Sequence, residues 1–290
     1  METFRVSHVS VLFQEVIDFL APHEGGRYID GTVGAGGHSA GILEASSPTG
    51  RLLGFDADPK SLAVAKENLA RFGERAILVH SNFENLKTIA DQNNFAPVDG
   101  IVLDLGLSSM QLADAERGFS FLTDGTLDMR FNPDEETNAA ELVNTLSEKE
   151  LADLIYAYGE EHASRRIARA IVYARPIKTA AHLASVIEKS MGRRGKIHPA
   201  TQTFQALRIA VNREIDVLEN VLPQAVELLK PQGRVAIISF HSLEDRIVKN
   251  FFRSSDQLRV LTKHPVRPSE EEVQTNSRSR SAKLRVAERI

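Results

Sequence analysis

Hydrophobic positions in the first hundred residues alternate between two periods, which predicts a series of strand and helix pairs. Short apolar runs that end in polar or glycine residues are typical of buried strands. Segments with apolar residues three and four positions apart, such as Leu62, Ala65 and Leu69, are typical of helices. The expected strands are 27–32, 51–56, 76–80 and 98–105, and the expected helices are 39–44, 59–72 and 84–93. Because strands that alternate with helices form a parallel, doubly wound sheet, we predict an α/β fold.

The alternation stops after Gly106. Residues 108–133 are expected to be irregular, and the segments after them have helical periodicity with no strand between them. A helix over 212–229 with a stop signal at its end returns the chain to the sheet. The last expected strands are 234–240, 258–262 and 283–287, and the polar segment 265–281 is expected to be mobile.

This order predicts a helical lobe inserted between the fourth and fifth strands of one sheet. We expect a sheet domain formed by residues 1–109 and 211–290, and an all-helical lobe at 110–210.

Composition narrows the class of protein. The chain has 290 residues, of which 42% are hydrophobic and 26% charged, as in globular proteins. It has no cysteine, so disulfides, thiolate metal sites and thiol nucleophiles are excluded. Glu15 and Asp18 interrupt the first apolar stretch, which does not fit a signal peptide, and no apolar run approaches the length of a membrane helix. We expect a cytoplasmic protein that binds no membrane and no metal; a homodimer is left open.

The net charge of −4 hides two basic regions. Residues 165–213 contain eleven lysines and arginines against one acidic residue, and residues 246–290 contain eleven against five. Solvated helical faces would account for either region alone. Two basic regions of more than forty residues attached to an acidic body are more typical of a polyanion-binding protein, so we expect RNA or DNA as a partner.

A glycine-rich turn follows the first strand. Gly34, Gly36 and Gly37 lack a Cβ, so a ligand can approach the backbone there. Asp56 ends the second strand, where a carboxylate can accept hydrogen bonds from both hydroxyls of an adenosine ribose. A purely structural turn is the alternative for the glycines, but the acid at this place favours a nucleoside cofactor.

The details of the turn favour S-adenosylmethionine over NAD. Ser39 stands where a dinucleotide-binding turn has its third glycine, and S-adenosylmethionine has no pyrophosphate to place there. Its sulfonium cation also suits an acidic surrounding. Four aspartates fall at or just beyond strand ends, although some, Asp58 above all, could simply cap a helix; they are Asp30, Asp56, Asp58 and Asp104.

Several longer strings resemble one enzyme family, the bacterial small-subunit ribosomal RNA cytosine-N4 methyltransferases (MraW, also called RsmH). The likeness spans the whole chain. The strings are Ile101–Gln111, Glu116–Phe121, Leu127–Arg130, Tyr158–Glu161, His198–Thr201, Phe204–Ile209, Ser239–Arg246 and Ser279–Arg285. Two positions depart from the family pattern, because Met110 stands where proline is common and Gln202 where arginine is expected.

The resemblance implies a class I methyltransferase fold, Rossmann-like, with the helical insertion. It implies an enzyme that moves a methyl group from S-adenosylmethionine to the exocyclic N4 of a cytidine in the decoding region of 16S rRNA, in the small ribosomal subunit. By matching positions, the cofactor contacts implied are Gly36, Gly37, His38, Asp56, Phe83, Asp104 and Gln111.

The cytosine amine is a poor nucleophile, so transfer depends on alignment and on acceptors for the amino hydrogens. The predicted catalytic residues are Asp104, Ser108, Ser109 and His241. Turn formation is the alternative for the serines, and a structural role is the alternative for the histidine.

Cationic residues of the helical lobe are the candidates for contact with RNA phosphates. They are Arg165 and Arg169 on one helix face and the basic turn Arg193, Arg194, Gly195 and Lys196. For Arg208 and Arg213, structural ion pairs are an equal alternative. Because aromatic residues are sparse in the lobe, we expect no base-stacking platform there.

Two other functions compete with the methyltransferase. One is a nicotinamide-dependent oxidoreductase on a Rossmann domain, which the serine in the glycine turn and the basic lobe disfavour. The other is a non-catalytic RNA-binding factor of ribosome assembly that keeps a vestigial nucleoside pocket.

Overall fold

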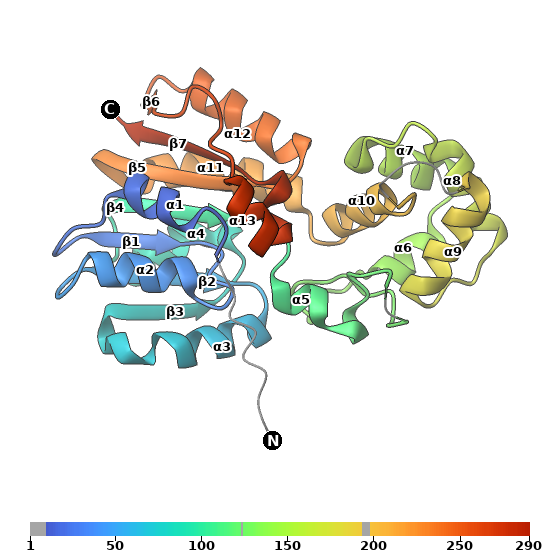
Figure 1. The fold of residues 1–290 in the computed structure, drawn as a ribbon, viewed down its shortest axis with the longest axis horizontal. Helices are drawn as coiled ribbons and strands as arrows, with labels where there is room; N and C mark the ends of the chain where they lie inside the picture. Colours follow the sequence, from blue (N-terminus) through green and yellow to red (C-terminus); the bar gives the residue numbers. More distant parts are fainter. Residues whose placement is uncertain (1–9, 123, 193–197) are drawn as a thin grey trace. The chain divides into compact units, whose positions relative to one another are not determined.

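The computed structural model describes residues 10–122, 124–192 and 198–290. The chain forms two compact units. The first, here the sheet unit, spans Met1–Gly106 and Asp216–Ile290, and the second, here the helical unit, spans Leu107–Ile215. Each is described by itself (Figure 1). In the described part of the chain, no helix has the length and apolar character needed to cross a membrane.

Seven strands of the described residues form one sheet in the order β3-β2-β1-β4-β5-β7-β6. All neighbours pair in parallel except β7, which runs antiparallel to β5 and β6. The strands are β1 (Arg27–Asp30), β2 (Arg51–Asp56), β3 (Ala76–His80), β4 (Val98–Asp104), β5 (Leu229–Ser239), β6 (Leu258–Val260) and β7 (Lys283–Arg289). The predicted doubly wound, mostly parallel α/β fold is confirmed.

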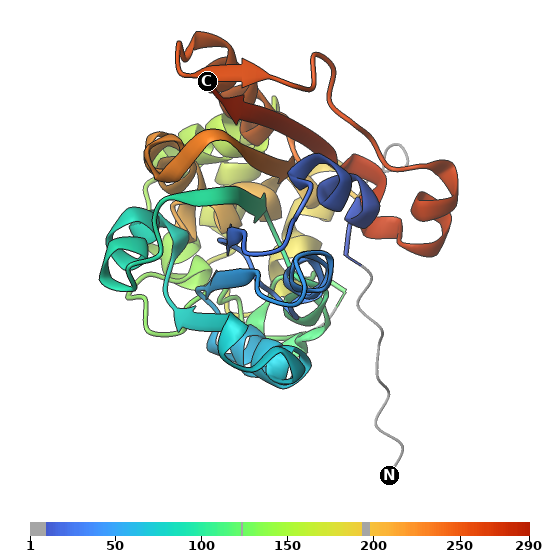
Figure 2. The ribbon, with the colours of Figure 1, turned by 90° about the vertical axis from the view of Figure 1, so that its left-hand side faces the viewer.

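Helices cover both faces of the sheet (Figures 1 and 2). One face carries α1 (Phe13–Leu20), α2 (Gly37–Ala45) and α3 (Pro59–Leu69), whose apolar residues share a core cluster with β1 and β2. The other carries α4 (Leu86–Gln92), α11 (Glu214–Leu228) and α12 (Ser242–Ser254). Short 3₁₀ helices η1 (Ala70–Arg75) and η2 (Phe83–Asn85) follow β2 and β3 in the chain.

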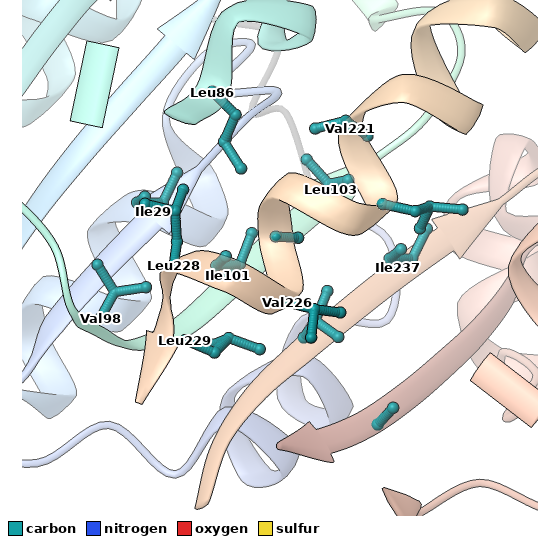
Figure 3. Close-up of a cluster of buried hydrophobic side chains, with 14 of the residues drawn as sticks. Ile29, Leu86, Val98, Ile101, Leu103, Val221, Val226, Leu228, Leu229 and Ile237 are labelled. Atoms are coloured by element: carbon teal, nitrogen blue, oxygen red, sulfur yellow. The ribbon is translucent and has the colours of Figure 1, made fainter. Parts of the chain in front are cut away.

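The strands are apolar runs in the sequence because their side chains are buried in the core. Ile29, Ile101 and Ile237 point from three neighbouring strands into the cluster of Figure 3, where Val221 and Val226 of α11 meet them. All are at most 5% exposed. Burying one such side chain contributes about 1.5–3 kcal/mol to stability, so this cluster fixes the strands whose ends carry the candidate site.

The segment 265–281 differs from its prediction. It contains α13 (Glu270–Thr275) and the 3₁₀ helix η4 (Ser277–Ser281). Glu272 accepts a hydrogen bond from the Leu12 backbone N–H at 2.9 Å, and Ser279 is fully buried. The prediction of a mobile segment was therefore wrong, because contacts with a part of the chain 260 residues away hold this polar sequence in place.

The described helical unit contains helices packed around a core of its own. They are α5 (Ser109–Ala113), η3 (Ala115–Arg117), α6 (Ala139–Thr145), α7 (Glu148–Gly159), α8 (Ser164–Tyr173), α9 (Ala180–Met191) and α10 (Thr201–Val211). Leu151, Ile167 and Leu207 are fully buried and join α7, α8 and α10. The loop between η3 and α6 closes on the unit through an isolated bridge between Thr126 and Thr179.

Candidate active site

Three carboxylates end three adjacent strands of the sheet. Asp56 ends β2, Asp30 ends β1 and Asp104 ends β4, and these strands are neighbours in parallel register. Parallel strands deliver their carboxyl ends to one edge, and the order of the sheet reverses between β1 and β4, which is where ligands bind in folds of this kind. The carboxylates therefore gather at the expected ligand-binding edge.

Asp56 is built as an acceptor. Its Oδ2 accepts the backbone N–H of Gly34 at 2.7 Å, and its Oδ1 accepts that of Asp58 at 2.8 Å. Each carboxylate oxygen has two lone pairs, so one remains on each oxygen. Burial raises the pKa of Asp56 to about 6, against the opposing effect of the two backbone hydrogen bonds. Two parallel acceptor positions on one carboxylate suit the paired hydroxyls of a ribose.

The glycine turn needs glycine for its backbone. Gly36 has φ of 87° and Gly34 has φ of 54°, values in the left-handed region that other residues seldom adopt. A Cβ on Gly36 would also come within 3.2 Å of the Leu69 side chain. The turn thus lies tightly against α3, and its backbone is tied to Asp56 through Gly34.

The other two turn residues contact the N-terminal segment of the described chain. A Cβ on Gly37 would lie 2.0 Å from the hydroxyl of Ser10. His38 is 5% exposed, and its Nε2 lies 3.0 Å from the carbonyl oxygen of Val11. This contact makes Nε2 the protonated nitrogen, since a carbonyl only accepts. The Nδ1 of His38 lies 4.0 Å from Oδ2 of Asp104, which is beyond hydrogen-bond distance.

Asp30 is buried at this edge and accepts hydrogen bonds from neighbouring residues of the protein. It is 1% exposed, and it accepts hydrogen bonds from the Ser39 hydroxyl at 2.6 Å and the Thr32 backbone N–H at 3.0 Å. The Thr32 hydroxyl in turn accepts the backbone N–H of Asp104 at 2.6 Å. Burial raises the pKa of Asp30 to about 6. Both oxygens of Asp30 are used within the protein, and Ser39, which departs from the dinucleotide pattern, is one of their donors.

Asp104 has a carboxylate oxygen that is buried but accepts no hydrogen bond from the described residues. Its side chain keeps 21% of its surface exposed, but its Oδ1 is buried and has no hydrogen-bond partner among the described residues. The pKa of Asp104 is raised to about 7, chiefly by burial; the charge of Arg278 opposes this shift, and the charges of Asp30 and Glu244 add to it. A buried polar atom without a partner is uncommon and points to a missing ligand group.

Thr32 and Arg278 belong to this site although the sequence did not single them out. Thr32 follows its strand by two residues, and its only signal was its place beside the glycine turn. Arg278 lies in η4, inside the segment predicted to be mobile. Burial lowers its pKa and the Asp104 charge raises it. Its signal was its position next to the string Ser279–Arg285.

Asp58 and Phe83 support neighbouring elements. The side chain of Asp58 accepts the Lys60 backbone N–H and caps α3, so the helix-cap alternative for this aspartate is confirmed. Phe83 begins η2 and packs against the core cluster beneath the site. A Cβ on Gly31 would lie 3.2 Å from Cβ of Phe83. Contact of Phe83 with an adenine stays a prediction.

The candidates on the helical unit form a helix cap. The Ser108 hydroxyl accepts the Gln111 backbone N–H at 3.1 Å, and the Gln111 side chain accepts the Ser108 backbone N–H at 3.0 Å. This reciprocal pair is a capping box that starts α5, of which Ser109 is the first residue. The catalytic roles of the two serines and the cofactor contact of Gln111 stay predictions.

His241 also caps a helix. Its Nδ1 faces the Glu244 backbone N–H at 3.4 Å, its Nε2 lies 3.1 Å from Oε1 of Glu244, and only 7% of its side chain is exposed. It thereby starts α12. The cap accounts for Nδ1, whereas Nε2 is buried and has no hydrogen-bond partner among the described residues. Contact of His241 with a base or phosphate stays a prediction.

The basic candidates fall into three groups. Arg165 and Arg169 lie on exposed positions of α8. Arg208 pairs with both oxygens of Glu214 at 2.8 and 2.9 Å, which makes it a structural ion pair. The turn formed by Arg193, Arg194, Gly195 and Lys196 lies outside the described residues.

The edge fits a nucleoside that carries a positive sulfur. Asp56 offers paired acceptors, the glycine turn admits backbone approach, and the unused oxygen of Asp104 lies among carboxylates that a cation would stabilise in their charged form.

Comparisons with known proteins point the same way. The model of the MraW methylase family matches residues 5–290. A ribosomal RNA small subunit methyltransferase H from Dehalococcoides mccartyi is 53% identical over 98% of this chain and 86% of its own length. Proteins of the same name from Thermomicrobium roseum and Desulfotalea psychrophila are 51% and 47% identical, covering 100% and 98% of this chain and 95% and 98% of their own.

These matches run over nearly the whole chain. They confirm the predicted enzyme class, a methyltransferase that uses S-adenosylmethionine, and they exclude the nicotinamide-dependent oxidoreductase. The chain belongs to the MraW methylase family.

Proposed function

We propose that this enzyme methylates the exocyclic N4 of a cytidine in small-subunit ribosomal RNA, in the cytoplasm. The names of the relatives support the RNA substrate. The observation that carries the choice of an amine is the buried, unpartnered Oδ1 of Asp104 at the end of β4. An amine needs an acceptor for its hydrogens at the place where it meets the methyl donor, and we assign this role to that oxygen.

Binding of the donor falls to the sheet unit. When bound, S-adenosylmethionine supplies an electrophilic methyl group on a positively charged sulfur. Asp56 would accept the two ribose hydroxyls on its remaining lone pairs, and the backbone of Gly36 would allow close approach beside it. Asp104 would face the positive charge, which favours its ionised form.

Alignment is the main task of the enzyme, because the lone pair of the cytosine amine is delocalised into the ring. A hydrogen bond from the amine to Oδ1 of Asp104 would orient the nitrogen and draw it toward a tetrahedral, more nucleophilic shape. Methylation makes the nitrogen acidic, and the same carboxylate would then receive its proton. A pKa of about 7 suits a group that must be ionised before transfer and take a proton afterwards.

The Thr32 hydroxyl keeps this carboxylate in place. It holds the Asp104 backbone N–H at 2.6 Å and is itself held by Asp30, which is buried beneath the edge. Neither group needs to touch the substrate. They fix the end of β4 so that the Asp104 side chain starts from one position, and loss of alignment by even 1 Å can slow an enzyme about 100-fold.

The test is mass mapping of methylated nucleosides after purified small ribosomal subunits are incubated with the protein and S-adenosylmethionine. We expect one N4-methylated cytidine per subunit. Methylation at a ring carbon, at a ribose hydroxyl or on another base would contradict the proposal, and so would the absence of product from both naked rRNA and assembled subunits.

A further inference from the structure

The outer face of α8 carries three arginines and an exposed tyrosine. Arg165, Arg166, Arg169 and Tyr173 are exposed, whereas Ile167, Ala168 and Ile171 are buried in the core of the helical unit. At 100° per residue the four exposed positions fall within an arc of about 100°. We call these four residues the arginine–tyrosine face.

We propose that the arginine–tyrosine face is a docking surface for single-stranded RNA, in which the arginines hold phosphates and the Tyr173 ring stacks on a base. The proposal rests on the proposed function, because that function supplies an RNA partner. It adds a recognition element that the sequence did not predict, because aromatic residues are sparse in this unit.

Tyr173 is an aromatic residue that does not contribute to the core of the protein. It is 93% exposed, more than any other large apolar side chain in the described part of the chain. It ends α8, one turn beyond Arg169. A tyrosine ring stacks on any base without regard to sequence, and such stacking is a common basis of single-strand binding.

The arginines are available for phosphates. Within the described residues, Arg165 and Arg166 have no ion-pair partner. Arg169 contacts Glu148 at 3.3 Å, with 77% and 44% of the two side chains exposed. An ion pair so exposed is weak and screened by salt, so a phosphate can replace it. No acidic residue lies in α8 itself, so nothing on the helix opposes a polyanion.

The length of the face fits a short piece of strand. From Arg165 to Tyr173 the helix rises about 12 Å, at 1.5 Å per residue. A stacked strand advances about 3.4 Å per nucleotide, so the face spans about three to four nucleotides. Arginines at one end and a ring at the other would thus meet neighbouring phosphates and one base of the same segment.

The experiment measures binding of the full-length protein to small-subunit rRNA, by filter binding from 50 to 200 mM salt, without the methyl donor. Tyr173→Ala should weaken binding about tenfold, and Tyr173→Phe should stay within about twofold of the unchanged protein because the ring is kept. The double variant Arg165→Gln/Arg166→Gln should flatten the dependence of log affinity on log salt by about 1.4, since each phosphate contact to a single strand contributes about 0.7.

The matched control is Lys149→Gln, which removes one exposed cation from the neighbouring helix α7, where Lys149 pairs with Asp153 at 3.2 Å. It should leave both affinity and salt dependence unchanged. Circular dichroism of each variant checks that the protein still folds.

Unchanged rRNA affinity in Tyr173→Ala, together with an unchanged salt dependence in the double variant, would overturn the proposal. Weaker binding to assembled subunits with normal binding to naked rRNA would also overturn it, because the partner would then be a ribosomal protein. The binding assay needs no methyl transfer. Failure of this inference is therefore seen separately from failure of the proposed function, which would appear as absence of methylated cytidine with the unchanged protein.

Discussion

The edge of the sheet and the arginine–tyrosine face both carry charges to which we assign a function, but in opposite surroundings. At the edge, Asp30, Asp56 and Asp104 are enclosed, and burial raises their pKa values to between about 6 and 7. On α8, Arg165 and Arg166 are exposed and their charge is permanent. Enclosed charges act through their ionisation and position, whereas exposed charges act through salt-dependent attraction. The two regions should therefore respond to different perturbations.

The largest effect is expected at the edge. Asp104→Asn keeps the size of the side chain but removes the proton acceptor, so we expect the rate of methyl transfer to fall by about 10²–10⁴-fold. Single-turnover incorporation of labelled methyl groups into small subunits measures it. The control is Asp99→Asn at the opposite end of the same strand, where Asp99 accepts the Arg27 backbone N–H. A transfer rate in Asp104→Asn equal to that of the control would refute the assigned role.

A core substitution should separate the two units. Ile167→Ala removes a fully buried side chain of the helical unit, and Leu53→Ala removes one from the sheet. Each should lower the free energy of unfolding by about 2–5 kcal/mol. We expect Ile167→Ala to reduce rRNA binding and leave donor affinity within a few-fold, and Leu53→Ala to reduce donor affinity. Denaturation measures the free energy of unfolding, and calorimetry measures the donor affinity. Equal loss of donor affinity in both variants would contradict the assignment of donor binding to the sheet unit.

Substitution of Asp56, the proposed acceptor of the ribose hydroxyls, should have a smaller effect, and this effect should be on the affinity for the methyl donor. Asp56→Asn replaces one of the two acceptor oxygens with an NH2 group, which only donates. We expect this change to weaken the affinity for S-adenosylmethionine about 10- to 100-fold, or by about 1.5–3 kcal/mol. Calorimetry with S-adenosylmethionine measures it. A 2′-deoxy analogue of the donor should lose less affinity in Asp56→Asn than in the unchanged enzyme; equal losses would place the ribose elsewhere.

Substitution of Thr32 tests whether this residue positions Asp104 without contacting the substrate. Thr32→Val keeps the shape but leaves the Asp104 backbone N–H without its acceptor, which costs about 1–3 kcal/mol of stability. We expect transfer to slow about tenfold while donor affinity changes little. Thr32→Ser, which restores a hydroxyl, should recover most of the rate. If the serine variant is as slow as the valine variant, the hydroxyl is not the cause.

The smallest effect is a pH dependence of donor binding. The raised pKa of Asp104 means that this group takes up a proton as pH falls from 8 to 6, and a protonated carboxyl no longer attracts a cation. Affinity for S-adenosylmethionine should therefore fall by about three- to tenfold over this range. S-adenosylhomocysteine has an uncharged sulfur and should show little change. Parallel pH profiles for the two ligands would show that Asp104 does not face the sulfur.

Much of the architecture could be predicted from the sequence. The strand at 51–56 and the one at 76–80 have the predicted bounds, because each is a short apolar run between strong breakers. The segment 229–233 was harder. It was expected to end a helix, but β5 begins at Leu229, which pairs with Val98 of β4. Such a pairing joins residues far apart in the chain, so local patterns could not show it.

The candidate site could be predicted in part. The acids at strand ends and the glycine turn were visible because strand ends of a parallel sheet meet at one edge. The helix-capping contacts of Ser108 and His241 were not, since a cap depends on backbone geometry at the start of α5 and α12. Arg278 was missed because only contacts with distant residues order its segment.

The sequence by itself determined the family, the alternation of strands and helices, and the chemistry placed at each strand end. Its motifs are local, and local periodicity is enough to decide which residues share a face. The tertiary structure alone decided which carboxylates are enclosed, which oxygen of Asp104 is left without a partner and how far Tyr173 is exposed. Burial is a property of what other parts of the chain cover, and it sets both the pKa of an acid and the availability of a ring.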